Sequence, residues 1–402
     1  MDYTENRLAD YSGDSRIGRG ALDVPFLLLV LLLLTIGVVM VLSASFARAY
    51  YSAATKHTGT FYFTRQLFFA VTGVAIMLVA SRFPIGFYRR FSGVLLLFSI
   101  VMLLLVLIGG VRANGARRWF AIGSITFQPS EIAKIAVILF EAQLICRFKD
   151  RMGTFRYGVL PFGIVAAVIV GLLVLEPHLS ASIIIIGVTA VMMFIGGTRL
   201  FWFLLGGGVV GLGGLIAINV LNYSSERVSA WLDPFADTSD TGYQIVQSLY
   251  AIGSGGLSGL GLGNGRQKYL YLPEEHNDFI FSVVCEELGF IGAALILILF
   301  ALLIIRGYWL ALHCKDRYSF LVCTGVTSLL ALQVILNVAV VTNLIPCTGI
   351  SLPFFSYGGT ALWLQLAEMG VILSISRDVP EKKFIRPRQK TPAKGREAGA
   401  GI

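Results

Sequence analysis

The sequence predicts an all-α polytopic membrane protein, a bundle of about ten transmembrane helices, from its composition and its apolar runs. Hydrophobic residues make up 56% of the 402 residues and charged residues only 14%, whereas soluble proteins carry about 25% charged residues. The mean hydropathy is +0.78. A helix needs roughly 20 mostly apolar residues to cross about 30 Å of hydrocarbon. Candidate spans lie near residues 24–46, 63–81, 92–111, 130–146, 158–175, 180–198, 201–223, 282–306, 319–341 and 359–376.

Basic residues gather in alternate loops between these spans, as the positive-inside rule describes. They are Arg16, Arg19, Arg82, Arg89, Arg90, Arg147, Lys149, Arg151, Arg156, Arg199, Arg306, Lys315, Arg317 and the tail from Arg377 to Arg396. We therefore expect both termini in the cytoplasm and a large extracellular loop, residues 224–280, between spans seven and eight. The net charge of +9 then reflects topology, and we expect no nucleic-acid partner.

Three regions follow from this pattern. Residues 1–22 are a polar cytoplasmic tail, residues 23–377 form the membrane domain, and residues 378–402 are a basic cytoplasmic tail. Asp23 and Pro25 suit the start of the first helix. Arg65, at the edge of the second span, either extends to the lipid headgroups or contacts substrate, and both interpretations stay open.

The short loop after the third span breaks the charge rule, because Arg112, Arg117 and Arg118 lie on its outer side. These arginines therefore have a task other than topology. Asn114-Gly115 indicates a turn in the same loop.

The fourth span begins with Ser130 and Glu131, and Glu131 and Lys134 lie one helical turn apart. Ionisable residues are costly in a membrane helix and usually pair or line a cavity. We expect a structural or cavity-lining pair, with direct catalysis as the alternative. After the fifth span, Glu176 and His178 predict either a solvated bend or a proton-handling pair.

The extracellular loop contains an amphipathic helix of about ten residues, too short to cross the membrane. Gln244, Gln247 and Ser248 share one face of it. The glycine-rich stretch that follows lacks phosphate-loop spacing. It predicts a turn that allows close backbone approach or, alternatively, backbone amides that cradle a pyrophosphate.

An acidic cluster, Glu274, Glu275 and Asp278, precedes the eighth span. A carboxyl group at a membrane boundary, near other acids, tends to have a raised pKa and is a candidate general base. Its alternative role is to cap the eighth helix, for which Asn277 or Asp278 is suited. Asn337 is polar within the ninth span, and the irregular loop after that span must be buried or line a wet cavity.

No metal site is predicted from the spacing of ligands. The five cysteines form no CxxC pair and have no histidine at zinc-ligand spacing.

Five motifs together identify a family. NGARRW, FQPSEIAK, GYQIVQSLYAIGSGG, YLPEEHNDFIF with EELG, and LPFFSYGG occur in this order between the predicted spans. The chain resembles the SEDS family, which contains FtsW, RodA and SpoVE, over roughly residues 24–376. It is more similar to the FtsW and SpoVE branches than to RodA.

The resemblance implies a peptidoglycan glycosyltransferase of the bacterial cytoplasmic membrane. Its substrates would be lipid II and the undecaprenyl-linked glycan, and its partners a class B penicillin-binding protein and the division or elongation machinery. The family's essential aspartate, in its HTDFIF motif, corresponds to Asp278, with Asn277 in place of threonine. Where many relatives have PDxGT, this chain has Pro177 and His178, so the role of that aspartate does not transfer.

The expected reaction is a single in-line displacement, because an α-linked donor becomes a β-linked glycan. We assign Asp278 as the base, and some subset of Arg117, Arg118, Arg227 and Lys268 as the charge that stabilises the leaving pyrophosphate. A divalent cation, Mg²⁺ or Mn²⁺, is a further option, and Gln244, Gln247 and Ser248 would orient sugar or phosphate. A lipid II flippase and a non-catalytic scaffold for the penicillin-binding protein are the alternative functions.

Overall fold

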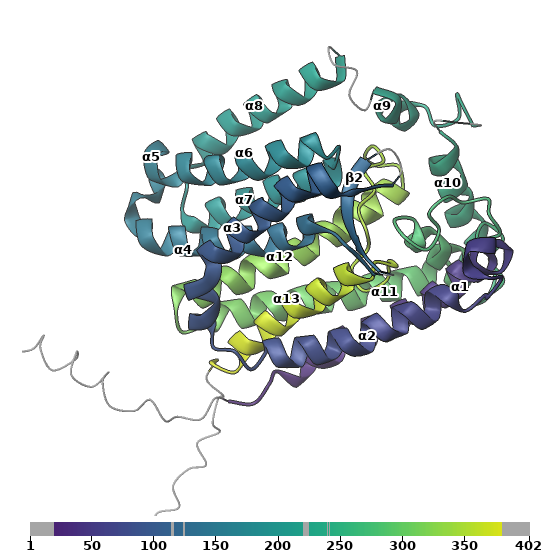
Figure 1. Cartoon of the computed structure of the whole chain (residues 1–402), viewed down its shortest axis with the longest axis horizontal. Coiled ribbons are helices and arrows are strands. Elements are labelled where there is room, and N and C mark those ends of the chain that lie inside the picture. The colour runs from purple at the N-terminus through teal and green to yellow at the C-terminus, as the bar shows by residue number, and fades with distance from the viewer. Residues whose placement is uncertain are drawn as a thin grey trace, which may run out of the picture.

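The computed structural model describes residues 20–379 apart from 114–115, 124, 220–224, 239 and 241, and the described chain is mostly helical (Figure 1). Its α-helices are α1 (Val24–Tyr51), α2 (Phe61–Ala80), α3 (Ile85–Gly109), α4 (Pro129–Phe148), α5 (Phe155–Gly158), α6 (Leu160–Leu175), α7 (Leu179–Gly196), α8 (Leu200–Asn219), α9 (Ser225–Leu232), α10 (Tyr243–Gly255), α11 (Ile280–Leu312), α12 (Arg317–Val341) and α13 (Thr360–Ser376). Short 3-10 helices cover Ala53–Thr55 and Lys149–Gly153. Most of both predicted tails, the Asn114-Gly115 turn and Ser224 lie outside the described residues.

One helix coincides with each predicted apolar segment, within a few residues at most ends. Seven stretches of the described chain are helices long and apolar enough to cross a membrane. The chain is therefore a helical, multi-pass membrane protein. The short amphipathic helix expected in the long polar segment is present as α10.

Helix α12 lies at the centre of the bundle, in contact with α4, α7, α11 and α13. In its most apolar 18-residue window 72% of the residues are buried, the largest share among the candidate spans. Outside it, α2 packs on α13, α3 packs on α4, and α1 contacts both α2 and α11 (Figure 1).

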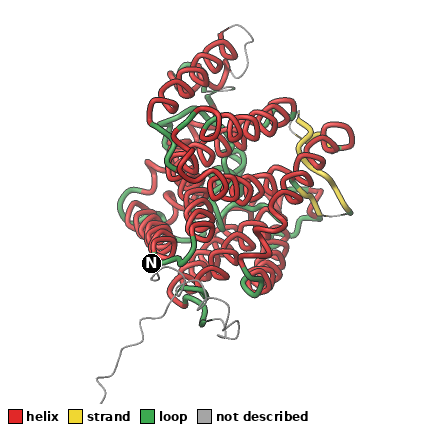
Figure 2. Tube along the Cα trace, turned by 90° about the vertical axis from the view of Figure 1, so that its left-hand side faces the viewer, coloured by secondary structure: helices red, strands yellow, loops and turns green. Residues whose placement is uncertain are grey.

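A small antiparallel sheet corrects the all-α expectation. Strands β1 (Val111–Ala113), β2 (Ala116–Ile122) and β3 (Ile125–Phe127) lie in the order β1-β2-β3 at one edge of the molecule (Figure 2). Two of the three strands have only three residues, too few for a period-two pattern to be recognised. Asn-Gly between short apolar stretches is nevertheless a strong hairpin signal, and it indicates two paired strands as well as the predicted turn.

Helix α11 is interrupted at Gly289, whose φ is 66° and ψ is −171°. In an unbroken helix the carbonyls of Glu286 and Glu287 would accept from the amides of Phe290 and Ile291. The glycine loop, residues 255–268, satisfies these four groups instead. Leu260 and Gly261 donate to the two carbonyls at 3.0 Å, and Phe290 and Ile291 donate to the carbonyls of Gly256 and Leu257 at 2.9 and 3.1 Å.

The carboxylates of Glu286 and Glu287 also bind the glycine loop. Glu286 accepts from the amide of Arg266 at 2.8 Å, and Glu287 accepts from the amide of Gly263 at 3.0 Å. The amides of Leu260, Gly261, Gly263 and Arg266 therefore donate to α11 and are not available to cradle a pyrophosphate. The expectation of a turn with close backbone approach is confirmed: a Cβ on Gly289 would lie 2.2 Å from the amide nitrogen of Gly259.

We predict that Gly289→Ala destabilises the protein by roughly 2–4 kcal/mol, because alanine is strained at this φ and its Cβ collides with backbone. The midpoint of thermal unfolding in detergent measures the loss. Gly253→Ala is the matched control, since a Cβ there meets nothing within 4 Å. Equal midpoints of thermal unfolding for the two variants would contradict the role of Gly289 in bringing α11 against the glycine loop.

Candidate active site

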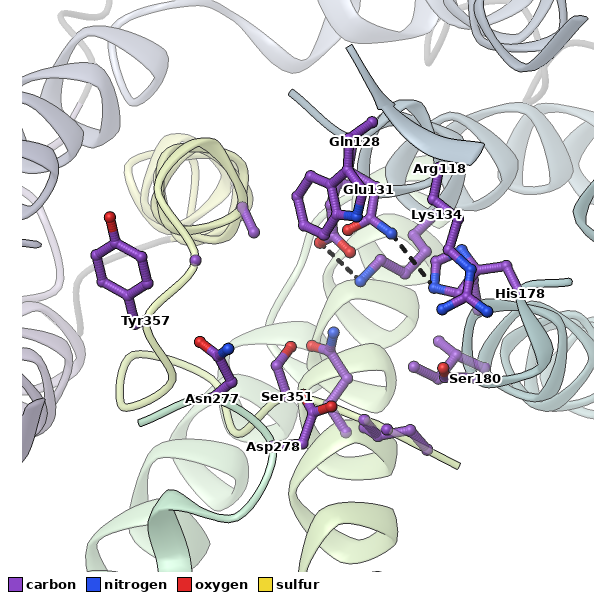
Figure 3. Close-up of a pocket in the computed structure, with 18 of the residues that line it drawn as sticks. Arg118, Gln128, Glu131, Lys134, His178, Ser180, Asn277, Asp278, Ser351 and Tyr357 are labelled. Carbon is purple, nitrogen blue, oxygen red and sulfur yellow. Dashed lines mark hydrogen bonds and ion pairs between the residues drawn. The ribbon is translucent and has the colours of Figure 1, made fainter. Parts of the chain in front are cut away.

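A cavity of about 240 Å³ lies at the end of the bundle where α4, α7, α11 and α13 begin (Figure 3). Strand β2 and the loop between α12 and α13 complete its walls. Its acidic and basic lining residues come from separate parts of the chain: Arg118, Glu131, Lys134, His178, Glu274 and Asp278. Helix N-termini carry partial positive charge, so this end of the bundle favours anions.

Asp278 belongs to the acidic segment, residues 274–278, which leads into α11. Three successive backbone carbonyls of this segment accept hydrogen bonds from other elements. The amide of Tyr357 donates to His276 at 2.8 Å, the hydroxyl of Ser356 to Asn277 at 2.8 Å, and the side-chain amide of Asn337 to Asp278 at 2.8 Å. The Asp278 side chain is thereby carried on a backbone that has little freedom to move.

The Asp278 carboxyl group faces the cavity and is half-buried. Burial, with a smaller contribution from Glu274, raises the pKa of Asp278 to about 6, although His276, Arg118 and Arg227 act in the opposite direction. Gly349, at φ 72°, lets the loop between α12 and α13 approach closely, because a Cβ there would lie 3.0 Å from Oδ2 of Asp278. Near pH 7 the group is mostly a carboxylate and can accept a proton. Neither Asn277 nor Asp278 caps α11, whose N-cap is Phe279 without a side-chain bond.

The facing side of the cavity holds a cationic wall, Arg118 and Lys134 (Figure 3). Arg118, on β2, donates Nε to the carbonyl of Glu176 at 3.2 Å and also donates to the carbonyl of Pro177. Lys134 Nζ lies 2.8 Å from Oε2 of Glu131, one turn earlier on α4. Both cations are thus fixed in place by neighbouring oxygens.

Glu176 and His178 occupy the turn between α6 and α7. The bend is therefore present, but it is not solvated as predicted, because both side chains are buried. Nε2 of His178 lies 3.3 Å from Nε2 of Gln128 (Figure 3). Burial, followed by the charges of Arg118 and Lys134, lowers the pKa of His178 to about 3, and burial raises the pKa of Glu176 to about 8. Both groups are therefore largely neutral near pH 7, and His178 presents an uncharged ring to the cavity.

The other predicted substrate contacts lie away from the cavity lining. Lys268 is 3% exposed, and its Nζ lies 2.7 Å from Oε1 of Glu287 and 3.1 Å from the hydroxyl of Ser43. Arg117 donates to the carbonyls of Leu107 and Ile108 at the end of α3, both at 3.3 Å. We assign Lys268 and Arg117 structural roles.

Arg227 does not line the cavity either. It donates to the carbonyl of Cys347 at 3.2 Å, and its positive charge acts to lower the pKa of Asp278.

The polar face of α10 supports neighbouring backbone. Ser248 is buried, with its hydroxyl 2.7 Å from that of Ser282 and donating to the carbonyl of Val341 at 2.7 Å. Gln244 donates to the carbonyl of Pro273 at 3.4 Å, next to the acidic segment. Gln247, on the same helix, does not line the cavity.

Gln128, Gln333 and Tyr357 are among the cavity residues that the sequence did not indicate as functional. Gln333 lies within an apolar span, where a polar side chain is itself a signal of a cavity. Gln128 and Tyr357 belong to motifs that were interpreted only as a helix start and a loop. Among the described residues, no three His, Cys, Asp or Glu side chains are grouped so that they could hold a metal ion.

The fold and the site define a class: a multi-pass helical protein with a carboxylate and a cationic wall facing each other at one end of the bundle. The chain matches the family model for FtsW, RodA and SpoVE, described as "Cell cycle protein", over residues 24–381. It belongs to this family.

Similar proteins agree with this assignment. Stage V sporulation protein E of Bacillus subtilis is 43% identical over 363 residues, which cover 88% of this chain and 97% of that protein. A probable peptidoglycan glycosyltransferase FtsW of Trichlorobacter lovleyi is 41% identical, with 88% and 93% covered.

Solved structures share the fold over most of the chain. One, described as showing "structural coordination of polymerization and crosslinking by a peptidoglycan synthase complex", matches with a TM-score of 0.72 and 29% identity over 89% of this chain and 98% of that one. The rod shape determining protein RodA of Thermus thermophilus matches with a TM-score of 0.66 and 28% identity, over 90% of this chain and 98% of that chain.

We predict that Lys134→Gln lowers stability by about 3 kcal/mol, because it leaves the buried Glu131 carboxylate without its partner. Buried Glu368 on α13 interacts electrostatically with both members of the pair. The double variant Glu131→Gln with Lys134→Gln should recover most of the loss in thermal unfolding. Arg147→Gln, an exposed change on the same helix, is the control, and a Lys134→Gln midpoint equal to that of this control would refute the prediction.

Proposed function

We propose that this chain is a peptidoglycan glycosyltransferase that polymerises lipid II into glycan strands at the outer face of the bacterial cytoplasmic membrane. Its membership of the FtsW, RodA and SpoVE family supports the activity, and relatives that carry the glycosyltransferase name are similar over most of their length. The observation that carries the mechanism is the placement of the Asp278 carboxylate in a cavity shared with Arg118 and Lys134.

In this mechanism Asp278 removes the proton from the acceptor hydroxyl while the donor sugar is displaced from its pyrophosphate. A positioned base typically accelerates such a step about 10²–10⁴-fold. Arg118, Lys134 and the helix N-termini stabilise the negative charge that develops on the leaving pyrophosphate. A divalent cation stays an additional option for that charge. The cavity of about 240 Å³ is smaller than pockets for drug-sized ligands, roughly 300–1,000 Å³, so only the reacting ends enter it.

The proposal also includes a membrane topology and a partner protein. Ten crossings, with both termini in the cytoplasm and residues 224–280 outside, place the cavity at the outer surface, where sugars react in water while the polyprenyl chain stays in lipid. The solved peptidoglycan synthase complex with this fold supports a class B penicillin-binding protein as the partner. Similarity to FtsW and stage V sporulation protein E favours a role in division or sporulation.

We predict that Asp278→Asn abolishes glycan polymerisation, with a loss of at least about 10²-fold, because asparagine keeps the size of the side chain but cannot accept the proton. The assay measures glycan chains formed from purified lipid II by the protein with its co-expressed class B partner. Asp233→Asn, an exposed change in the same long segment, should keep full activity, and both variants should unfold at the wild-type temperature.

Other outcomes of this assay identify the alternative functions. Retained polymerisation by Asp278→Asn would overturn the assignment of the base. Transport of labelled lipid II across reconstituted vesicles without polymer would identify a flippase. Full cellular function of Asp278→Asn, lost only on changes at partner-facing helices, would identify a scaffold.

The raised pKa of Asp278 predicts how the wild-type rate depends on pH. Because the base must be ionised, kcat/KM should fall about tenfold per pH unit below a midpoint near 6 and level off above it. Glu274→Gln removes a neighbouring negative charge that contributes to the raised pKa, so its midpoint should move to lower pH. A profile that is flat down to pH 5 for both proteins would show that a different group limits the rate.

A further inference from the structure

Helix α1 is joined to other parts of the protein by two guanidinium–carboxylate pairs, one at each of its ends. At its start, Asp23 accepts from Arg306 of α11, whose Nε lies 3.0 Å from Oδ1. At its other end, Arg48 donates Nε and Nη2 to the two carboxylate oxygens of Glu275 at 2.6 and 2.7 Å. Both pairs are bidentate, the geometry in which guanidinium–carboxylate contacts are strongest.

The two pairs differ in what they hold. The Asp23 carboxylate caps α1 itself, accepting from the amide of Phe26 at 2.9 Å. Glu275 belongs to the acidic segment, three residues before Asp278, and its side chain is 0% exposed, whereas that of Arg48 is 32% exposed. Burial alone would raise the pKa of Glu275, but its interactions with His276 and Arg48 outweigh burial and hold the pKa below its ordinary value.

Glu275 connects α1 to the backbone that carries Asp278. Its Oε1 lies 3.7 Å from Nδ1 of His276. The ring of His276 in turn packs against Tyr62 of α2 and Tyr357, with centroids 4.7 and 5.8 Å apart. The carbonyls of residues 276 to 278 are fixed from the other side by Tyr357, Ser356 and Asn337. The segment is therefore held by α1 through Glu275, and by α12 and the loop between α12 and α13 through its backbone carbonyls.

We propose that Arg48 and Glu275 are positioning residues for Asp278: their ion pair holds the acidic segment so that the carboxylate faces the cationic wall. The proposal rests on the proposed function, since it assigns the pair a task in that reaction. Neither residue lines the cavity, so both act through the backbone and not on substrate. A displacement of about 1 Å in a reacting group is enough to reduce a rate by about 10²-fold.

The test compares the two ends of α1 in the full-length protein with its class B partner. Arg48→Gln and Glu275→Gln should each lower kcat for lipid II polymerisation about 10–100-fold with little change in KM, because the base is misplaced while the binding groups remain. Arg306→Gln, which breaks the matched pair at the other end, should lower the unfolding temperature but keep kcat within about twofold of the wild type.

A double variant separates positioning from stability. Arg48→Gln leaves the buried Glu275 carboxylate unpaired, which is strongly destabilising. Adding Glu275→Gln removes that unpaired charge, so the double variant should regain unfolding temperature while its kcat stays low. Arg48→Lys, which keeps the charge but not the bidentate contact, should recover only part of the rate.

The acid limb of the pH profile is a readout that a purely structural role would not move. The groups that act on Asp278, which are Glu274, His276, Arg118 and Arg227, are unchanged in all these variants. Arg48 and Glu275 are not among these groups, so a moved limb in either single variant reports that the Asp278 carboxyl has left its enclosed position; because burial is the largest cause of its raised pKa, the limb should move to lower pH.

The decisive results are distinguishable. If Arg48→Gln keeps wild-type kcat and an unmoved acid limb while Asp278→Asn is inactive, the positioning role is refuted and the proposed function stands. If Asp278→Asn remains active, the proposed function itself fails.

Discussion

Negative charge at the end of an apolar helix bundle has to be offset, and this constraint organises the structure around the cavity. Helices α4, α7, α11 and α13 all begin there, so their positive N-terminal ends converge on one point. Arg118 and Lys134 add two fixed cations. The half-buried Asp278 carboxylate is tolerated in such surroundings, and an incoming pyrophosphate is stabilised by the same groups.

The second requirement is rigidity of the backbone that carries the carboxylate. The acidic segment is short and irregular, yet its carbonyls are bonded to α12 and to the loop between α12 and α13, and its Glu275 to α1. In α11, which follows this segment, the helix is broken at Gly289. Two helical hydrogen bonds are replaced there by four hydrogen bonds to the glycine loop. A site built in this way is ordered before substrate arrives, so little ordering remains to be done during the reaction.

The helices could be predicted from the sequence because a long apolar run has essentially one backbone arrangement in a bilayer. Asp278 and Arg118 could also be singled out, one from an acidic cluster beside a span and the other from its conflict with the charge rule. The contacts between helices could not. Ser43 and Glu287 are 244 residues apart and Arg48 and Glu275 are 227 apart, and no local pattern specifies which turns of two helices face each other. Lys268 was grouped with the substrate-binding cations for this reason, since its partner is known only once α1 and α11 are packed.

The most direct measurement is the position of bound lipid II in a cryo-electron microscopy structure of the Asp278→Asn variant with its partner. The account predicts the donor pyrophosphate against Arg118 and Lys134, and the acceptor hydroxyl about 3 Å from the side chain at position 278. A substrate whose sugars lie outside this cavity, or whose pyrophosphate contacts neither cation, would contradict it.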